Sequence, residues 1–227
     1  MAEVLPLKLT EVSFPQGHPQ EGDTGPVLAF AVVHASGLLL FDTGVGSGDQ
    51  EVDAWYRPAR RPLEDVLAGH GLAIGDVTVL ANSHLHFDHC GQNELFVGMP
   101  IYVQAAEFQA VHGPDYTVPK WVDFPGAVYE LLDGEAEVLP GIRLIPTPGH
   151  TPGHQSLVVQ EPEGPTVVAG QAVYTLAEWE GATDRRRSGQ PSAWDSNVYA
   201  VSVRRLRALE PRRVLFSHDE ATWERSS

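Results

Sequence analysis

The sequence of 227 residues has one cysteine and no apolar run that approaches the ~20 residues of a membrane-spanning helix. The lone cysteine, Cys90, cannot form an internal disulfide, which agrees with a reducing compartment. The first ten residues, MAEVLPLKLT, contain neither the basic flank nor the apolar core of a signal peptide. We therefore expect a soluble, cytoplasmic protein that does not insert into a membrane.

Basic residues are also scarce. Lysine and arginine number 15 against 30 aspartates and glutamates, so the formal net charge is -15. Such a chain repels a phosphate backbone unless it carries a local basic stripe. The nearest candidate, DRRRSG at 184–189, contains three arginines and is typical of a solvated loop. We expect no nucleic-acid partner.

The apolar residues occur in short runs, rich in valine and leucine, that end at glycine or proline. This pattern is typical of strands, and 42% hydrophobic residues are enough to bury a sizeable core. Strands are expected at 27–33, 38–42, 77–82, 101–104, 142–147, 156–160, 166–170 and 213–217. The short link HASG between the first two predicts a hairpin.

Helices are predicted at 62–71, 105–113 and 196–209, the last with an apolar stripe opposite its arginines. The order of strands and helices predicts a single globular unit, with two β-rich layers and helices outside them. Two aromatic and proline-rich segments, 112–126 and 176–194, interrupt this order. They are either binding loops or variable surface padding.

The segment NSHLHFDHC (82–90) holds three histidines and an aspartate within six positions. Further histidines follow in TPGHTPGHQS (147–156) and in LFSHDEATW (215–223). Each group comes directly after a predicted strand, where ligand sites in α/β sheets gather. Because imidazole and carboxylate bind zinc, iron and manganese, the segments predict a metal site, with a plain polar turn as the alternative.

These motifs resemble the metallo-β-lactamase superfamily, whose fold is an αββα four-layer sandwich of the α/β class. The similarity extends from Asp42 to His218, which implies a single metallo-β-lactamase-like domain over 1–227. Within the superfamily, SHLHFDHCGQN, TPGHTPGHQS and SHDEATW are most similar to the N-acyl-homoserine lactonases.

The resemblance implies two ligand sets for metal ions. One ion would be bound by His84, His86 and His154, and a second by Asp88, His89 and His218. His150 is then left with a structural or supporting role. Zinc, as one or two ions per chain, is the implied cofactor, and iron or manganese are alternatives. Asp42 is expected to accept the second N–H of a ligand imidazole, or else to order a turn before Gly44.

One position departs from the lactonase pattern. Most relatives have an aspartate that bridges both ions at the position of Gln171, and a neutral amide cannot supply that charge. The second ion is therefore expected to bind weakly or not at all. Tyr174 matches a lactonase tyrosine that points at the substrate carbonyl, with core packing as its alternative. Cys90 is expected to be a small buried residue, or else a soft ligand or an oxidisable thiol.

The implied activity is that of a metal-dependent hydrolase that opens the lactone ring of N-acyl-homoserine lactones, or a related small lactone or ester, through a metal-bound hydroxide. Asp88 is expected to hold the nucleophile and pass a proton to the leaving alkoxide, while Tyr174 stabilises the oxyanion. An acyl groove is expected from six aromatic residues, Phe87, Tyr116, Trp121, Phe124, Trp179 and Trp194.

Two alternatives remain. A thioester hydrolase of the glyoxalase II type would use a basic pocket from arginines 185–187 or from Lys120. A metal-binding protein without turnover is favoured only by Gln171. The expected partner is a small lactone or ester, and the possible formation of a homodimer stays open.

Overall fold

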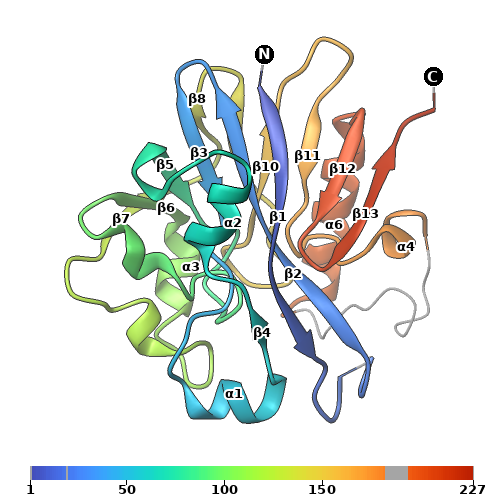
Figure 1. The fold of residues 1–227 in the computed structure, drawn as a ribbon. Helices are drawn as coiled ribbons and strands as arrows, with labels where there is room; N and C mark the ends of the chain where they lie inside the picture. The colour runs from blue at the N-terminus through green and yellow to red at the C-terminus, as the bar shows by residue number, and fades with distance from the viewer. Residues whose placement is uncertain (1, 19, 182–193, 227) are drawn as a thin grey trace.

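The computed structural model describes residues 2–18, 20–181 and 194–226, which form two β-sheets with helices outside them (Figure 1). The first sheet contains β1 (Glu3–Ser13), β2 (Thr24–His34), β3 (Gly37–Phe41), β4 (Ala59–Arg60), β5 (Val77–Ala81), β6 (Pro100–Gln104) and β7 (Val128–Leu132). Their order is β4-β1-β2-β3-β5-β6-β7. The predicted hairpin is confirmed, since β2 pairs antiparallel with β3, and β3, β5, β6 and β7 then run parallel.

The second sheet contains β8 (Ala136–Leu139), β9 (Ile142–Pro146), β10 (Gln155–Val159), β11 (Thr166–Val168), β12 (Arg213–Phe216) and β13 (Asp219–Glu224). Its order is β13-β12-β11-β10-β9-β8. Only β11 and β12 run parallel, because α6 (Ser196–Ala208) lies between them in the chain and carries it back across the sheet.

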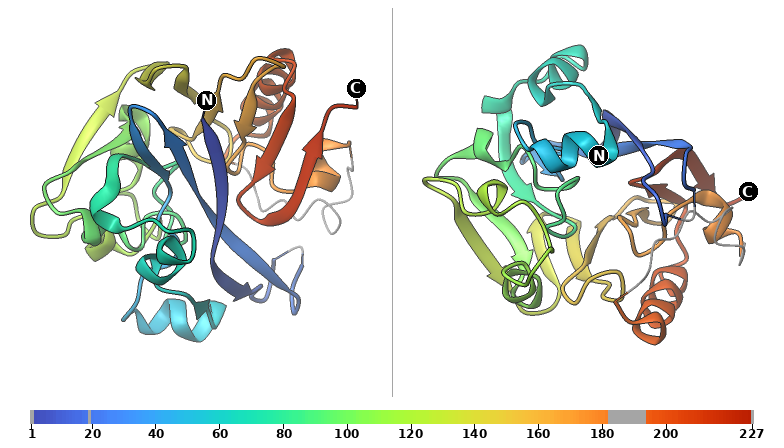
Figure 2. Two further views of the ribbon diagram at one scale, coloured as in Figure 1. Left: turned by 45° about the horizontal axis from the view of Figure 1, so that its top comes forward. Right: turned by 90° about the horizontal axis from the view of Figure 1, so that it is seen from below.

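The sheets pack face to face through a buried cluster that both supply, including Phe30 and Phe41 from the first and Leu144 and Leu157 from the second. The outer face of the first sheet is covered by α1 (Gln50–Tyr56), α2 (Leu63–Gly69) and α3 (Ala105–Ala110). The outer face of the second sheet is covered by α4 (Leu176–Trp179) and α6. The predicted αββα sandwich is confirmed, and Figure 2 shows its layers from two further directions.

The three predicted helices are present, each slightly shorter than expected. The sequence reading missed α1, α4 and the strands β1, β4, β7, β8 and β13. In α1 only Val52 is buried, so it has no apolar stripe, and its start depends on Asp49, which accepts hydrogen bonds from the backbone of residues 51 and 52. Among the described residues there are also three short 3₁₀ helices, η1 (Ile74–Asp76), η2 (Asn93–Phe96) and η3 (Pro119–Trp121).

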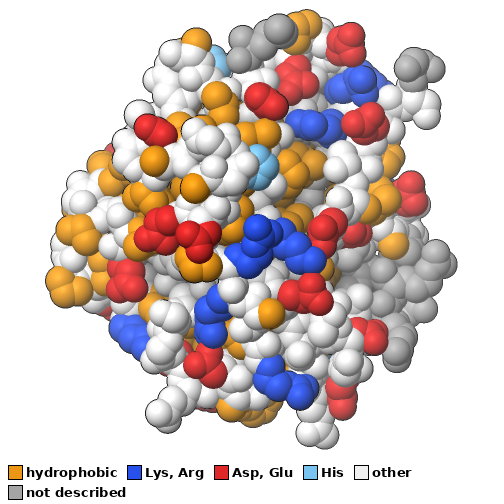
Figure 3. Space-filling model, viewed as in Figure 1, with side chains coloured by type: hydrophobic (Ala, Val, Ile, Leu, Met, Phe, Trp, Pro, Cys, Tyr) orange, Lys and Arg blue, Asp and Glu red, His pale blue; other side chains and the backbone are white. Residues whose placement is uncertain are grey.

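The surface seen in Figure 3 carries basic side chains in small groups among acidic ones. Within the part of the chain that the structure describes, no helix combines the length and apolar character needed to cross a bilayer. The arginine run 185–187 lies outside the described residues.

Candidate metal centre

The histidine-bearing segments all meet at one edge of the sandwich. Residues 82–90 follow β5, residues 147–154 connect β9 to β10, and His218 follows β12. Asp42 follows β3, and Gln171 follows β11. The carboxyl ends of neighbouring strands therefore bring together side chains that are far apart in the sequence, as predicted.

The first group of possible ligands contains His84, His86 and His150. The Nδ1 atom of His86 lies 3.0 Å from His84 Nε2 and 3.1 Å from His150 Nε2. Tetrahedral zinc, with Zn–N bonds of about 2.0–2.1 Å, separates its ligand nitrogens by roughly 3.3 Å, so this group needs to open only slightly. We refer to these three residues as the first triad.

The histidines of the first triad are uncharged at neutral pH. Burial lowers the pKa of His86 to about 4, although the nearby Asp88 carboxylate opposes the shift. Burial and the neighbouring imidazoles hold the pKa values of His84 and His150 well below their usual range. Each neutral imidazole therefore has one ring nitrogen with a free lone pair, and the neutral imidazole is the form that binds a cation.

The second triad contains Asp88, His89 and His218. The Nε2 atoms of both histidines lie 3.5 Å from Asp88 Oδ2. Their other ring nitrogens donate, His89 Nδ1 to Asp42 at 2.8 Å and His218 Nδ1 to the carbonyl of Pro26 at 3.1 Å. In the neutral form of each ring, Nε2 carries the lone pair and faces the Asp88 carboxylate, and neither Nε2 has a hydrogen-bond partner among the described residues. A cation between these three atoms satisfies all of them.

Asp42 makes the expected hydrogen bond to an imidazole, that of His89. Besides His89, it accepts hydrogen bonds from the backbone N–H of Ser83 at 2.7 Å and from Ser83 Oγ at 2.8 Å. Ser83 Oγ in turn lies 3.0 Å from His84 Nδ1. Asp42 has a backbone φ of 68°, a left-handed conformation that is uncommon outside glycine and is often found where function requires it.

The structure corrects the expectation for His154. Its Nδ1 donates to the carbonyl of Thr147 at 3.1 Å, and its Nε2 accepts the backbone N–H of Gln171 at 2.9 Å. Both ring nitrogens are thus engaged, and His150 takes the place in the first triad that the resemblance implied for His154. The two histidines stand in nearly identical settings, PGHT and PGHQ, so local sequence does not distinguish them.

Comparisons with known proteins agree with this geometry. Residues 22–218 match the Metallo-beta-lactamase superfamily. An N-acyl homoserine lactonase from a Bacillus species is 37% identical over 211 residues, which cover 86% of this chain and 81% of that protein. The chain belongs to the N-acyl homoserine lactonase family of the metallo-β-lactamase superfamily. It is a lactonase-like, metal-dependent hydrolase.

Solved lactonase structures have the same architecture. A variant of AiiA from Bacillus thuringiensis with N-decanoyl-L-homoserine bound at its active site has a TM-score of 0.78 at 26% identity, and covers 96% of this chain and 93% of its own. An N-acyl homoserine lactone hydrolase with its product N-hexanoyl-L-homoserine at the catalytic metal centre has a TM-score of 0.77 at 26% identity, with the same coverage.

In this lactonase-like hydrolase, Gln171 and Tyr174 lie next to the second triad. The side-chain oxygen of Gln171 is buried without a hydrogen-bond partner in the described chain, so it is available to a cation but brings no charge. The Tyr174 ring stacks on His218 with centroids 4.5 Å apart. Burial and the Asp88 carboxylate raise the pKa of Tyr174 well above its usual value, so its hydroxyl stays protonated.

Cys90 lies in the core, which confirms the expectation of a small buried residue. It is fully buried, and its Sγ donates to the carbonyl of Leu85 at 3.4 Å. Burial raises the pKa of the thiol, which keeps it uncharged. Cys90 belongs to neither triad.

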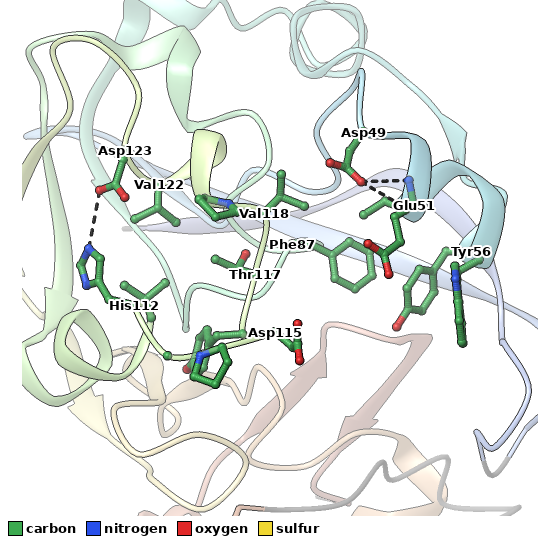
Figure 4. A pocket seen from close by; sticks show the side chains of 17 residues that line it. Asp49, Glu51, Tyr56, Phe87, His112, Asp115, Thr117, Val118, Val122 and Asp123 are labelled. Carbon is green, nitrogen blue, oxygen red and sulfur yellow. Dashed lines mark hydrogen bonds and ion pairs between the residues drawn. The ribbon is translucent and has the colours of Figure 1, made fainter.

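Figure 4 shows a pocket of about 730 Å³ whose wall includes Phe87, between the triad residues His86 and Asp88 in the chain. Two of the six expected aromatic residues line it. The Phe87 ring lies 4.5 Å from that of Tyr56, and the Tyr116 ring lies 4.8 Å from that of His86. The pocket therefore adjoins the first triad, and its walls include apolar and aromatic side chains suited to an acyl chain.

The other four expected aromatic residues lie elsewhere. Trp121 and Phe124 are buried in the core cluster that also contains residues of α1 and α2. Trp179 packs against Trp223 on the second sheet, and Trp194 is exposed. Sequence position within a long segment did not reveal which side chains turn inward.

Charge on the pocket wall bears on the glutathione alternative. Four carboxylates line the pocket, from Asp49, Glu51, Asp115 and Asp123, and no lysine or arginine of the described chain does so. The Nζ atom of Lys120 donates to the carbonyl of Gly48 instead. The described wall of the pocket therefore offers no cation to the carboxylates of a glutathione thioester.

The sequence reading gave no role to Glu107, the buried carboxylate of α3. It accepts hydrogen bonds from both ligand-bearing loops and from Tyr116. A glutamate within a predicted helix is ordinarily solvent-exposed, so nothing in the sequence distinguished it from a surface residue.

Proposed function

We propose that the protein opens the lactone ring of N-acyl homoserine lactones, with one cation bound by the first triad and a second by the second triad. The observation that carries the proposal is that the two triads adjoin each other, with a protonated tyrosine beside the second and a pocket with aromatic walls beside the first. The lactonase relatives, one with a bound N-acyl homoserine product, support the choice of substrate.

Zinc is the proposed ion at both triads, because neutral imidazoles with one carboxylate are a ligand set it accepts. When bound, such ions supply a Lewis acid for the ester carbonyl and make water a nucleophile near neutral pH. The second ion binds more weakly, since Gln171 adds an amide and no negative charge.

The protein side chains place the substrate and move its protons. The Tyr174 hydroxyl donates a hydrogen bond to the lactone carbonyl, where negative charge develops during attack. Burial opposes ionisation of Asp88, but His89 and His218 keep its pKa below the usual value, so it is a carboxylate that can take up a proton.

The reaction adds one water to the lactone. The water oxygen bonds to the carbonyl carbon, its proton passes to Asp88, and the ring C–O bond breaks. Asp88 then returns the proton to the alkoxide that leaves. Because the alkoxide remains tethered, the product is a single hydroxy acid, whose acyl chain lies along Phe87 and Tyr116 in the pocket.

Ring opening releases acid and can be followed with a pH indicator on zinc-loaded protein. We expect loss of turnover in His86→Ala, and a 10²- to 10³-fold lower kcat in Tyr174→Phe, which is the usual loss for one donor to an oxyanion. The controls are His70→Ala, which replaces an exposed histidine that belongs to neither triad, and Tyr129→Phe, which removes a hydroxyl that donates to the carbonyl of Val122. Unchanged rates in both test variants would overturn the proposal.

We also infer that residues 1–227 form one metallo-β-lactamase-like domain. The inference is supported by the shared cluster between the two sheets and by the triads, which draw their residues from both.

A further inference from the structure

Glu107 is a fully buried carboxylate that belongs to neither triad. Its Oε1 accepts the backbone N–H of Leu85 at 2.8 Å and the hydroxyl of Tyr116. Its Oε2 accepts Thr151 Oγ1 at 2.7 Å and the backbone N–H of Gly153 at 3.2 Å. Four donors therefore converge on one carboxylate.

The donors come from the segments that build the first triad and its pocket. Leu85 lies between the ligands His84 and His86, and Thr151 directly follows the ligand His150. Tyr116 lines the pocket and lies against the His86 ring. Glu107 thus ties together two loops that are distant in sequence and one wall of the pocket.

The loop that carries His150 lies directly against the backbone of Glu107. A Cβ atom placed on Gly153 would lie 2.0 Å from the backbone nitrogen of Glu107 and 2.4 Å from its Cβ. Glycine at 153 is therefore required for this close approach of the loop to α3. The contact fixes the loop that carries His150.

The charge of Glu107 also bears on the first triad. An ionised carboxylate only accepts hydrogen bonds, and its four donors fit that form. Burial raises the pKa of Glu107, while the hydrogen bonds from Tyr116 and Thr151 lower it. No lysine, arginine or histidine of the described chain lies within ion-pair distance, so a cation in the adjacent triad would compensate a charge that is costly to bury.

We propose that Glu107 is a positioning residue that holds His84, His86 and His150 in their ligating arrangement and favours a dication between them. This inference rests on the proposed metal dependence of the protein. It assigns to Glu107 a second effect, on the placement of Tyr116 at the pocket wall. The second triad should be independent of Glu107, because its histidines are held by Asp42 and by the carbonyl of Pro26.

The test is zinc affinity of the purified full-length protein, measured by competition with a chelating dye. Glu107→Gln keeps the shape of the side chain but places an NH₂ group against two donors. We expect one of the two zinc ions to bind 10- to 100-fold more weakly, the usual effect of removing a partner behind the ligands, and the other to bind unchanged.

A double-mutant cycle identifies the ion concerned. In a His150→Ala background, where the first triad is already incomplete, Glu107→Gln should have little further effect on zinc binding. An equal effect with and without His150 would mean that Glu107 stabilises the fold in general, and would overturn the inference.

If Glu107→Gln does not fold, two milder variants test whether Glu107 positions the first triad. Thr151→Val and Tyr116→Phe each remove one hydrogen bond to the carboxylate, and Tyr129→Phe is the matched control for the second. Wild-type zinc affinity in both would overturn the inference. Zinc binding that depends on Glu107 in a protein without lactonase activity would instead refute only the proposed function.

Discussion

Replacing Asp42 with asparagine tests how the second triad is prepared for a metal ion. In the native protein Oδ2 of Asp42 accepts from His89 Nδ1 at 2.8 Å, which keeps the proton on Nδ1 and the lone pair on Nε2. Asparagine is the suitable change because it tolerates the left-handed backbone that Asp42 adopts, where alanine would add strain.

The size of the effect follows from the contacts of Asp42. The amide oxygen of asparagine can keep the bond from the Ser83 backbone, but its NH₂ group then faces Ser83 Oγ and His89 Nδ1. His89 must move its proton to Nε2, which blocks the ligand atom. A hydrogen bond to a charged acceptor contributes about 1.5–3 kcal/mol. At about 1.4 kcal/mol for each factor of ten, the second ion should bind roughly 10- to 150-fold more weakly.

The assay measures zinc affinity by competition with a chelating dye, and Asp49→Asn is the control variant. Asp49 also accepts two backbone N–H groups, at the start of α1, but contacts no triad residue. Unchanged affinity of both ions in Asp42→Asn would refute the argument that this carboxylate sets the tautomer of His89.

Three further predictions concern the bridge, the pH dependence and the pocket. Gln171→Asp adds a carboxylate beside the second triad, so dialysis against a weak chelator should leave more zinc per chain than in the native protein; equal retention would contradict this. In metal-free protein, the pKa values of His86 and His218 are each lowered to about 4, so the unfolded chain binds more protons between pH 6.5 and 4. Stability should therefore fall on acidification through this window, by up to about 1.4 kcal/mol per pH unit for each histidine, and a midpoint of urea unfolding that is equal at pH 7 and pH 4.5 would argue against it. Burial also lowers the pKa values of His84, His150 and His154, which acts in the same direction. The raised pKa values of His89, Glu107 and Glu178 act in the opposite direction. Phe87→Ala should lower kcat/KM for a ten-carbon acyl chain roughly tenfold relative to a four-carbon chain, since it removes about 1.5 kcal/mol of apolar contact; equal losses for both substrates would place the acyl chain elsewhere.

The sequence predicted the sheets well because each core strand carries its own signal. The runs at 38–42 and 77–82 are almost wholly buried as β3 and β5, and a continuous apolar run identifies such a strand without knowledge of its neighbours. The strands that were missed lack that signal. In β7 three of five residues are exposed, since it lies at the edge of its sheet. The helix α1 likewise buries one residue.

The site was predicted less completely than the fold. The residues in HLHFDH could be assigned because their spacing is distinctive, and His218 because it follows a strand directly. The choice between His150 and His154 depends on which ring nitrogen each loop residue leaves free, and only the contacts with Thr147 and Gln171 determine that. Tertiary contacts, not local sequence, also give Glu107 its place.

The most direct test of the account adds zinc stepwise to metal-free protein and follows the opening of N-decanoyl homoserine lactone by acid release, with zinc content measured in parallel. Without metal the ring should stay closed, and the rate should rise with zinc up to two ions per chain, the second at higher free zinc than the first. A protein that carries zinc in both triads and leaves the lactone intact would contradict the account, as would equal turnover without metal.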